Sequence, residues 1–219
     1  MKITFIARII VLALLCLPMI VTKAQTKTTA AKTILDQVSK KYDSYRTIMA
    51  DFSFEAAQAD GQKYNDAGSL KLDKAGNKYR IQLNAQEIIS DGKSVWSILP
   101  EDKEVQVSEV DNSAETLGPQ NLFTFYRTGY DYTALADERV GKQALKAIQL
   151  TPTDKSSSYA KIKLRINANN HIHDIKVFDK AGSSYTYTVN ALYVNQAIPT
   201  NIFTFQKNQF KDFELVDLR

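Results

Sequence analysis

Short segments in which apolar and polar residues alternate recur along most of this chain, and they constrain its fold more than any other feature. Phe52 and Phe54 are separated by polar residues, and Leu70 and Leu72 repeat the pattern further on. A period of two places successive side chains on opposite faces of a strand, so that one face is buried and the other is solvated. The pattern therefore predicts half-buried antiparallel strands.

Turn-forming residues separate these segments. Asp60-Gly61, Asp91-Gly92, Asn169-Asn170 and Lys180-Ala181-Gly182 each lie between two apolar segments, and such residues tolerate the positive φ of hairpin turns. The segments predict roughly ten strands that follow one another as a meander. We find no internal repeat and no low-complexity linker, so we expect one continuous sheet in one domain.

Two segments depart from the period of two. Between residues 28 and 48, apolar residues that include Leu35, Val38 and Tyr42 recur at three- and four-residue spacing. This spacing predicts an amphipathic helix over 28–48 that lies on the core. A shorter, aromatic helix is predicted from Gln120 to Arg127, because Pro119 suits the first position of a helix.

The N-terminus has the order of a secretory signal. Basic residues precede an apolar run from Ile9 to Val21, and small residues follow that run. The run contains Pro18 and is shorter than the roughly 20 apolar residues that a membrane span needs. We expect residues 1–24 to be a cleavable signal peptide and residues 25–219 to form the single mature domain.

The net charge argues against nucleic acid as a partner. The chain has 28 Lys and Arg against 24 Asp and Glu. Three of the basic residues, Lys2, Arg8 and Lys23, lie in the predicted signal segment, which has no acidic residue, so the mature balance is 25 minus 24, or +1. A nucleic-acid-binding domain needs a clustered basic face.

The single cysteine, Cys16, lies inside the apolar run. Leu14 and Leu15 precede it, whereas a lipidation site requires a small residue there. We therefore expect Cys16 to be removed with the signal peptide. The mature domain then has neither a disulfide nor a thiol for catalysis.

The sequence contains none of the common catalytic signatures, so we predict no enzyme, no catalytic residue and no cofactor. His171 and His173 at strand spacing are compatible with a metal site, but they adjoin the Asn169-Asn170 turn, and we favour a surface turn without a metal. Asp91-Gly92 is similarly interpreted as a hairpin turn rather than as a catalytic carboxylate.

Apolar residues are numerous for a sheet with one buried face. The sheet either curls to cover itself or encloses an apolar cavity, and for Phe52, Phe54, Tyr79, Trp96 and Phe123 the sequence leaves both interpretations open.

Several motifs follow one another in a fixed order over most of the mature chain. They are Gly68-Ser69-Leu70-Lys71-Leu72, Tyr79-Arg80-Ile81, Ile89-Ser90-Asp91-Gly92-Lys93-Ser94-Val95-Trp96, Pro100, Leu150-Thr151-Pro152 and Phe203-Thr204-Phe205. Together these motifs resemble those of the periplasmic outer-membrane lipoprotein carrier family.

This resemblance implies an α+β, mainly β fold: an incomplete, half-open antiparallel β-barrel lidded by short α-helices. Its apolar cavity would hold the acyl chains of lipoproteins, without chemistry on any bond. The cavity lining would be Phe52, Phe54, Leu70, Leu72, Tyr79, Ile81, Trp96 and Ile98, and the lid would be Leu122, Phe123, Phe125 and Tyr126.

The resemblance also implies partners and a location. The partners would be acylated lipoproteins, an inner-membrane ATP-driven lipoprotein-releasing complex and an outer-membrane acceptor, and the carrier would be a monomer in the periplasm of a Gram-negative bacterium. Where members of the family carry a lid-latching arginine, this chain has Lys74. The alternative function is a periplasmic sensor of lipoproteins or other amphiphiles on the same half-barrel scaffold.

Overall fold

The computed structural model describes residues 21–111 and 121–219. Most of the predicted signal segment, residues 1–20, lies outside this part of the chain. Within the described residues, a 13-stranded sheet is accompanied by one α-helix and three short 3₁₀ helices. No helix in this part of the protein combines the length and the apolar character that crossing a bilayer requires.

The strands succeed one another mostly as hairpins. They are β1 (Thr47–Ala57), β2 (Lys63–Asp73), β3 (Lys78–Gln82), β4 (Glu87–Ser90), β5 (Ser94–Leu99), β6 (Glu104–Glu109), β7 (Tyr130–Ala134), β8 (Glu138–Val140), β9 (Gln143–Pro152), β10 (Tyr159–Ile166), β11 (Ile172–Asp179), β12 (Ser184–Val194) and β13 (Glu214–Asp217).

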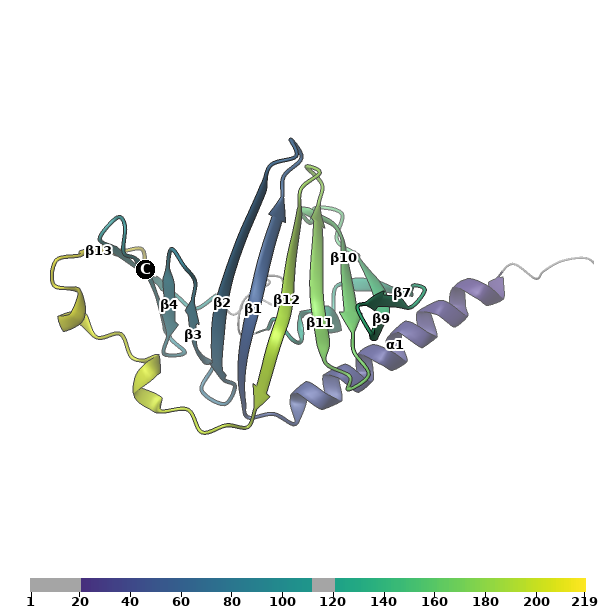
Figure 1. The fold of residues 1–219 in the computed structure, drawn as a ribbon, viewed down its shortest axis with the longest axis horizontal. Helices are drawn as coiled ribbons and strands as arrows, with labels where there is room; N and C mark the ends of the chain where they lie inside the picture. Colours follow the sequence, from purple (N-terminus) through teal and green to yellow (C-terminus); the bar gives the residue numbers. More distant parts are fainter. Residues whose placement is uncertain (1–20, 112–120) are drawn as a thin grey trace, which may run out of the picture.

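The order of strands in the sheet confirms the predicted half-open architecture. Neighbouring strands run β13-β6-β5-β4-β3-β2-β1-β12-β11-β10-β9-β7, and β8 pairs with β9. All pairings are antiparallel except that of β13 with β6. The two ends of the sheet, β13 and β7, are not paired with each other, so the curved sheet stays open, as Figure 1 shows.

The long helix α1 (Val21–Asp43) runs along one face of the sheet. The prediction that it continues to residue 48 is wrong at its C-terminal end. Ile48 belongs to β1 and pairs with Leu72 and Val194. Tyr45 continues the helical spacing and is buried, but it follows the helix in a turn closed by its N–H donating to the Tyr42 carbonyl oxygen at 3.2 Å.

The predicted helix from Gln120 to Arg127 is much shorter in the structure. Gln120 lies outside the described residues, and only Phe125–Arg127 form a 3₁₀ helix, η1. The preceding residues form a turn in which the Phe125 N–H donates to the Asn121 carbonyl oxygen at 2.7 Å. Two further 3₁₀ helices, η2 (Thr200–Phe203) and η3 (Lys207–Phe210), lie near the C-terminus.

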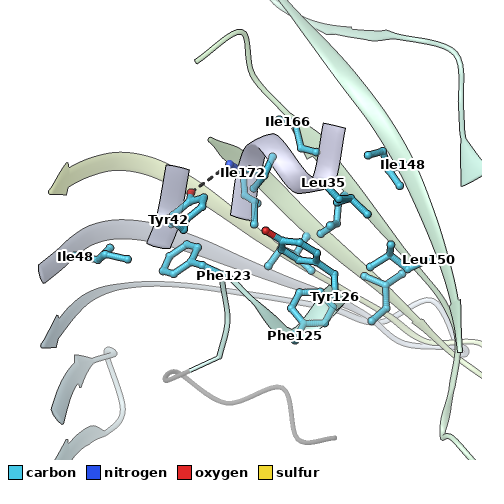
Figure 2. Packing of buried hydrophobic residues seen from close by; sticks show 14 of the residues in the cluster. Leu35, Tyr42, Ile48, Phe123, Phe125, Tyr126, Ile148, Leu150, Ile166 and Ile172 are labelled. Atoms are coloured by element: carbon cyan, nitrogen blue, oxygen red, sulfur yellow. Dashed lines mark hydrogen bonds between the residues drawn. The ribbon is translucent and has the colours of Figure 1, made fainter. Parts of the chain in front are cut away.

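The two faces of the sheet carry separate apolar clusters. We call the face that contacts α1 and η1 the inner face. Its large cluster joins residues from α1, such as Leu35 and Tyr42, with residues from the strands, such as Ile48 and Ile172 (Figure 2). These side chains are almost completely buried, so burial on this face supplies most of the hydrophobic stabilisation of the fold.

The opposite, outer face is also apolar where β4, β5 and β6 meet. We call the group of Ile89, Trp96, Ile98, Val105, Phe205, Phe210 and Phe213 the outer cluster. The C-terminal segment, residues 200–213, supplies its three phenylalanines. Arg80 anchors this segment, since its guanidinium donates to the Ile202 carbonyl oxygen at 3.1 Å and pairs with Glu87 at 2.6 Å.

Candidate functional site

The inner face brings together most of the residues that the sequence predicted to line a binding site. Leu70 and Leu72 of β2 lie opposite Ile81 and Tyr79 of β3, respectively. Leu70, Leu72 and Tyr79 are buried in the inner cluster, and Phe52 and Ile81 pack against it. The alternation of β2 and β3 therefore produces one continuous apolar surface.

Phe54 lies on the same face of β1, two residues closer than Phe52 to the turn between β1 and β2, and opposite Tyr187 of β12. Its ring centroid is 4.9 Å from that of Tyr187, 6.4 Å from that of Tyr185 and 6.3 Å from that of Tyr64. Burial raises the pKa of Tyr187, whereas Tyr64 is 50% exposed. This aromatic group extends the inner face beyond the helix and remains partly open to solvent.

The prediction that Trp96 and Ile98 line the same face as Leu70 and Leu72 is wrong. Ile88 of β4 packs against the inner cluster, whereas its neighbour Ile89 belongs to the outer cluster. Ile89 lies opposite Trp96, and Ile98 lies opposite Val105. Because successive side chains alternate across the pleat, Trp96 and Ile98 point to the outer face.

The predicted lid residues lie on the inner face. Phe123, Phe125 and Tyr126 are buried, and Leu122 packs against the same cluster. The rings of Phe123 and Tyr42 are stacked, with centroids 4.6 Å apart and planes inclined by 9°. The aromatic rings fill the space between α1 and the sheet, as Figure 2 shows. In this conformation the part of the inner face beneath α1 and the lid is packed core.

Polar contacts join the lid to α1. Ser39 donates its hydroxyl to the Tyr126 hydroxyl oxygen at 3.2 Å. Arg127 forms an ion pair with Asp43 at 2.6 Å and also donates to the Ser39 carbonyl oxygen at 3.4 Å. Burial raises the pKa of Tyr126, and the Ser39 hydrogen bond opposes this shift. Ser39 and Asp43 are four residues apart, so they share one side of the helix.

Lys74, predicted as a substitute latch, contacts the end of α1 instead of the lid. Its ammonium donates to the Tyr42 carbonyl oxygen at 2.6 Å and lies 3.5 Å from that of Asp43. A cation at this end of a helix satisfies carbonyl groups that have no partner within the helix. Burial has the largest effect and lowers the pKa of Lys74. The negative charge of Asp43 opposes this shift, and the positive charge of Arg127 adds to it. Arg127, rather than Lys74, forms the ion pair that joins the end of the lid to the helix.

Tyr42 holds α1 against the sheet as well as against the lid. Its side chain is fully buried, and its oxygen accepts a hydrogen bond from the Ile172 N–H at 3.2 Å (Figure 2). Burial raises its pKa far above the ordinary tyrosine value. The neighbouring Tyr45 hydroxyl lies 2.7 Å from His171 Nε2.

The two histidines have structural partners. Burial lowers the pKa of His171, and Lys41 lowers it further. His173 Nδ1 lies 2.6 Å from the buried carboxylate of Asp174. Arg165 forms an ion pair with the same carboxylate at 2.8 Å. No three His, Cys, Asp or Glu residues in the described ranges are grouped so as to hold a metal ion.

The turns next to these candidate residues form as predicted. Asn170 has a φ of 58°, and Gly92 has a φ of 92°. Asp91 Oδ1 accepts hydrogen bonds from the Lys93 and Ser94 N–H groups, both at 2.9 Å. Asp91 therefore closes the hairpin between β4 and β5.

Comparison with solved structures supports the fold. An uncharacterised conserved protein from Thermus thermophilus matches with a TM-score of 0.57 at 14% identity, covering 86% of this chain and 99% of that chain. The lipoprotein LppX from Mycobacterium tuberculosis matches with a TM-score of 0.51 at 10% identity, covering 78% of this chain and 98% of that one.

A LolA superfamily protein from Nitrosomonas europaea aligns over 80% of this chain and 97% of its own, with a TM-score of 0.42 and 13% identity. No curated protein matches the chain. The model of the family described as outer membrane lipoprotein carrier protein LolA matches residues 43–206, which is most of the sheet together with the lid. The chain therefore belongs to the LolA family of outer membrane lipoprotein carriers.

Proposed function

We propose that this protein is a periplasmic carrier that shields the acyl chains of lipoproteins on its inner face. The observation that carries the proposal is the lid itself, in which three aromatic side chains cover an apolar sheet face and few polar contacts hold them. The proposed lining is Phe52, Phe54, Leu70, Leu72, Tyr79 and Ile81, and the proposed lid is Leu122, Phe123, Phe125 and Tyr126.

The lid aromatics and an acyl chain can exchange on the inner face, because the burial energies of the two are of similar size. Burial of one large apolar side chain stabilises by about 1.5–3 kcal/mol, so exposing three lid aromatics costs roughly 5–9 kcal/mol. An acyl chain of about sixteen carbons gains roughly 12 kcal/mol when it leaves water, at about 0.8 kcal/mol per methylene. One chain taken from water is therefore sufficient to displace the lid. A chain taken from the inner membrane is already out of water and gains no such energy, so loading there requires the ATP-driven complex.

The closed conformation corresponds on this proposal to the unloaded carrier. An inner-membrane ATP-driven complex would supply the lipoprotein, and an outer-membrane acceptor or the outer membrane itself would receive it. The export signal predicted over residues 1–24 and the family membership support this route. The carrier would act as a monomer in the periplasm and would break no bond.

The test is the composition of the protein purified from the periplasm of its host without detergent. We expect native mass spectrometry to show acylated lipoproteins bound in one-to-one complexes. A Phe52→Asp variant, which places a charge on the inner face, should lose them. A matched Phe178→Asp variant on the outer face should keep them, because Phe178 neighbours inner-facing Val177 in β11 and points the other way.

Equal lipoprotein content in the two variants would contradict the proposed site. A wild-type protein that is always empty, and that also fails to release lipoproteins from inner-membrane vesicles, would contradict the proposed function.

A further inference from the structure

The outer face contains a second apolar site, on the opposite side of the sheet from the lid. Its rings form a continuous series. Trp96 stacks on Phe205 with centroids 5.5 Å apart, and Phe205 stacks on Phe210 at 5.3 Å. Phe213 meets Phe210 edge-on at 5.3 Å. All four rings are only partly buried, so the C-terminal segment covers this face incompletely.

A cavity of about 420 Å³ opens along this series of rings. It is lined by Val105, Phe205, Lys207, Asn208, Phe210, Lys211, Phe213 and Leu215. Its volume falls within the range of roughly 300–1,000 Å³ that small-molecule sites occupy. Leu215, on β13, is 46% exposed at its margin, and we call the whole cavity the outer groove.

The charges of the outer groove have one sign. Lys207 and Lys211 are its only charged lining residues, and both are exposed. Neither ammonium has a hydrogen-bond or ion-pair partner among the residues that the structure describes. Lysine stems lie readily along apolar surface while their charged ends stay in water. The groove therefore combines an apolar floor with two free positive charges at its rim.

This combination fits an amphiphile with one chain and one anionic head. From the floor and the rim together we infer that the outer groove binds a single acyl chain whose carboxylate or phosphate head lies between Lys207 and Lys211. An adjoining cavity of about 390 Å³ shares Phe210 but is lined largely by polar residues, among them Arg80 and Gln209, so the apolar chain is directed toward Phe213 and Leu215. This site is independent of the carrier function proposed for the inner face.

The chain carries its own reporter for this site. Trp96 is the only tryptophan, and it stacks on Phe205, which lines the groove. Bromine atoms quench tryptophan fluorescence at short range. Titration of the mature protein with dibrominated stearate should therefore quench Trp96 in a saturable manner. The paired substitution Lys207→Glu with Lys211→Glu should weaken binding at least about tenfold, or about 1.4 kcal/mol, because two attractive charges near the anionic head become repulsive.

Two controls define the site. A matched pair, Lys142→Glu with Lys146→Glu, changes the net charge equally at exposed positions outside the groove, and it should leave the quenching curve unchanged. Phe52→Asp on the inner face should also leave it unchanged. Loss of quenching in Phe52→Asp would place the chain on the inner face and overturn the inference.

Other outcomes also overturn it. These are no saturable quenching by dibrominated stearate, equal affinity in the Lys207 and Lys211 double variant, or equal affinity for the uncharged methyl ester. Vesicles of brominated anionic phospholipid should quench little, because a bilayer does not enter the groove. Quenching by vesicles as strong as that by dibrominated stearate would identify a membrane-docking surface instead.

Discussion

At the scale of single residues, Arg127 is the contact whose removal should affect lid opening most directly. Its ion pair with Asp43 joins side chains that are 38% and 55% exposed, and exposed pairs contribute up to about 1 kcal/mol. Arg127→Met should therefore lower the free energy of unfolding by less than about 1 kcal/mol. It should raise the apparent affinity for acyl chains up to about fivefold, since the open form becomes more populated.

Urea denaturation measures the first quantity, and binding of a fluorescent fatty acid measures the second. The binding is measured in the Lys207→Glu, Lys211→Glu background, in which the outer groove is expected to bind weakly. Arg139→Met, at an exposed position without an ion pair among the described residues, is the matched control. An Arg127→Met variant with unchanged or weaker affinity would show that this ion pair does not restrain the lid.

Gly68 has no room for a side chain. A Cβ atom there would contact the Gln82 carbonyl oxygen and would lie 2.9 Å from the Phe52 ring. Overpacking of this kind typically costs about 1–3 kcal/mol. Gly68→Ala should lower the free energy of unfolding by that amount in urea denaturation, whereas Ala67→Ser at the exposed neighbouring position should change it little. Equal stability of the two variants would contradict the close packing of Phe52 on β2.

His171 should make stability depend on pH. Burial and Lys41 lower its pKa in the folded protein, so the unfolded chain binds the proton more readily. Stability from the neutral imidazole is then complete above the unfolded pKa of about 6.5 and declines as the pH falls below it. His171→Gln should remove this part of the decline between about pH 7 and pH 5. Parallel stability curves for the variant and the wild type would contradict it.

At the scale of elements, the sequence predicted the strands better than their faces. Clear alternation in β2 and β3 assigns Leu70, Leu72 and Tyr79 to one side. In β4 the apolar residues Ile88 and Ile89 are adjacent and face opposite clusters. Alternation cannot identify the inner side of a strand that is covered on both faces. Trp96 and Ile98 were misplaced for this reason.

The contacts of the lid could not be predicted from neighbouring residues in the sequence, for a different reason. Arg127 and Asp43 are separated by 84 positions in the chain, and only the folded sheet brings them together. Lys74 was assigned to the lid by analogy with the family arginine, yet the turn between β2 and β3 places it at the end of α1. The end of α1 itself was missed because Tyr45 continues the helical spacing after the helix has ended.

The hydrogen bond from the Ile172 N–H to the Tyr42 hydroxyl should help to hold α1 on the sheet. Tyr42→Phe keeps the stacking on Phe123 but leaves the buried Ile172 N–H without its acceptor. An unsatisfied buried donor costs about 1–3 kcal/mol. We expect the free energy of unfolding in urea to fall by that amount. A variant as stable as the wild type would show that this hydrogen bond does not contribute to holding α1 on the sheet.

At the scale of the whole molecule, one open sheet separates two apolar surfaces. The inner surface is covered by α1 and the lid, and the outer surface is partly covered by residues 200–213. The apolar surplus in the sequence, which left a packed core and a cavity as alternatives, is divided between these two faces. The inner face is packed in the closed form, so the carrier proposal requires the lid to move before a lipoprotein binds.

The most direct test of that proposal is site-specific photo-crosslinking in the periplasm of the host. A photoreactive phenylalanine analogue at Phe52 places the probe on the inner face, and the same analogue at Phe178 places it on the outer face. We predict that acylated lipoproteins are crosslinked at Phe52 and not at Phe178. Crosslinking at Phe178 alone, or at neither position while lipoproteins are being exported, would contradict the carrier function assigned to the inner face.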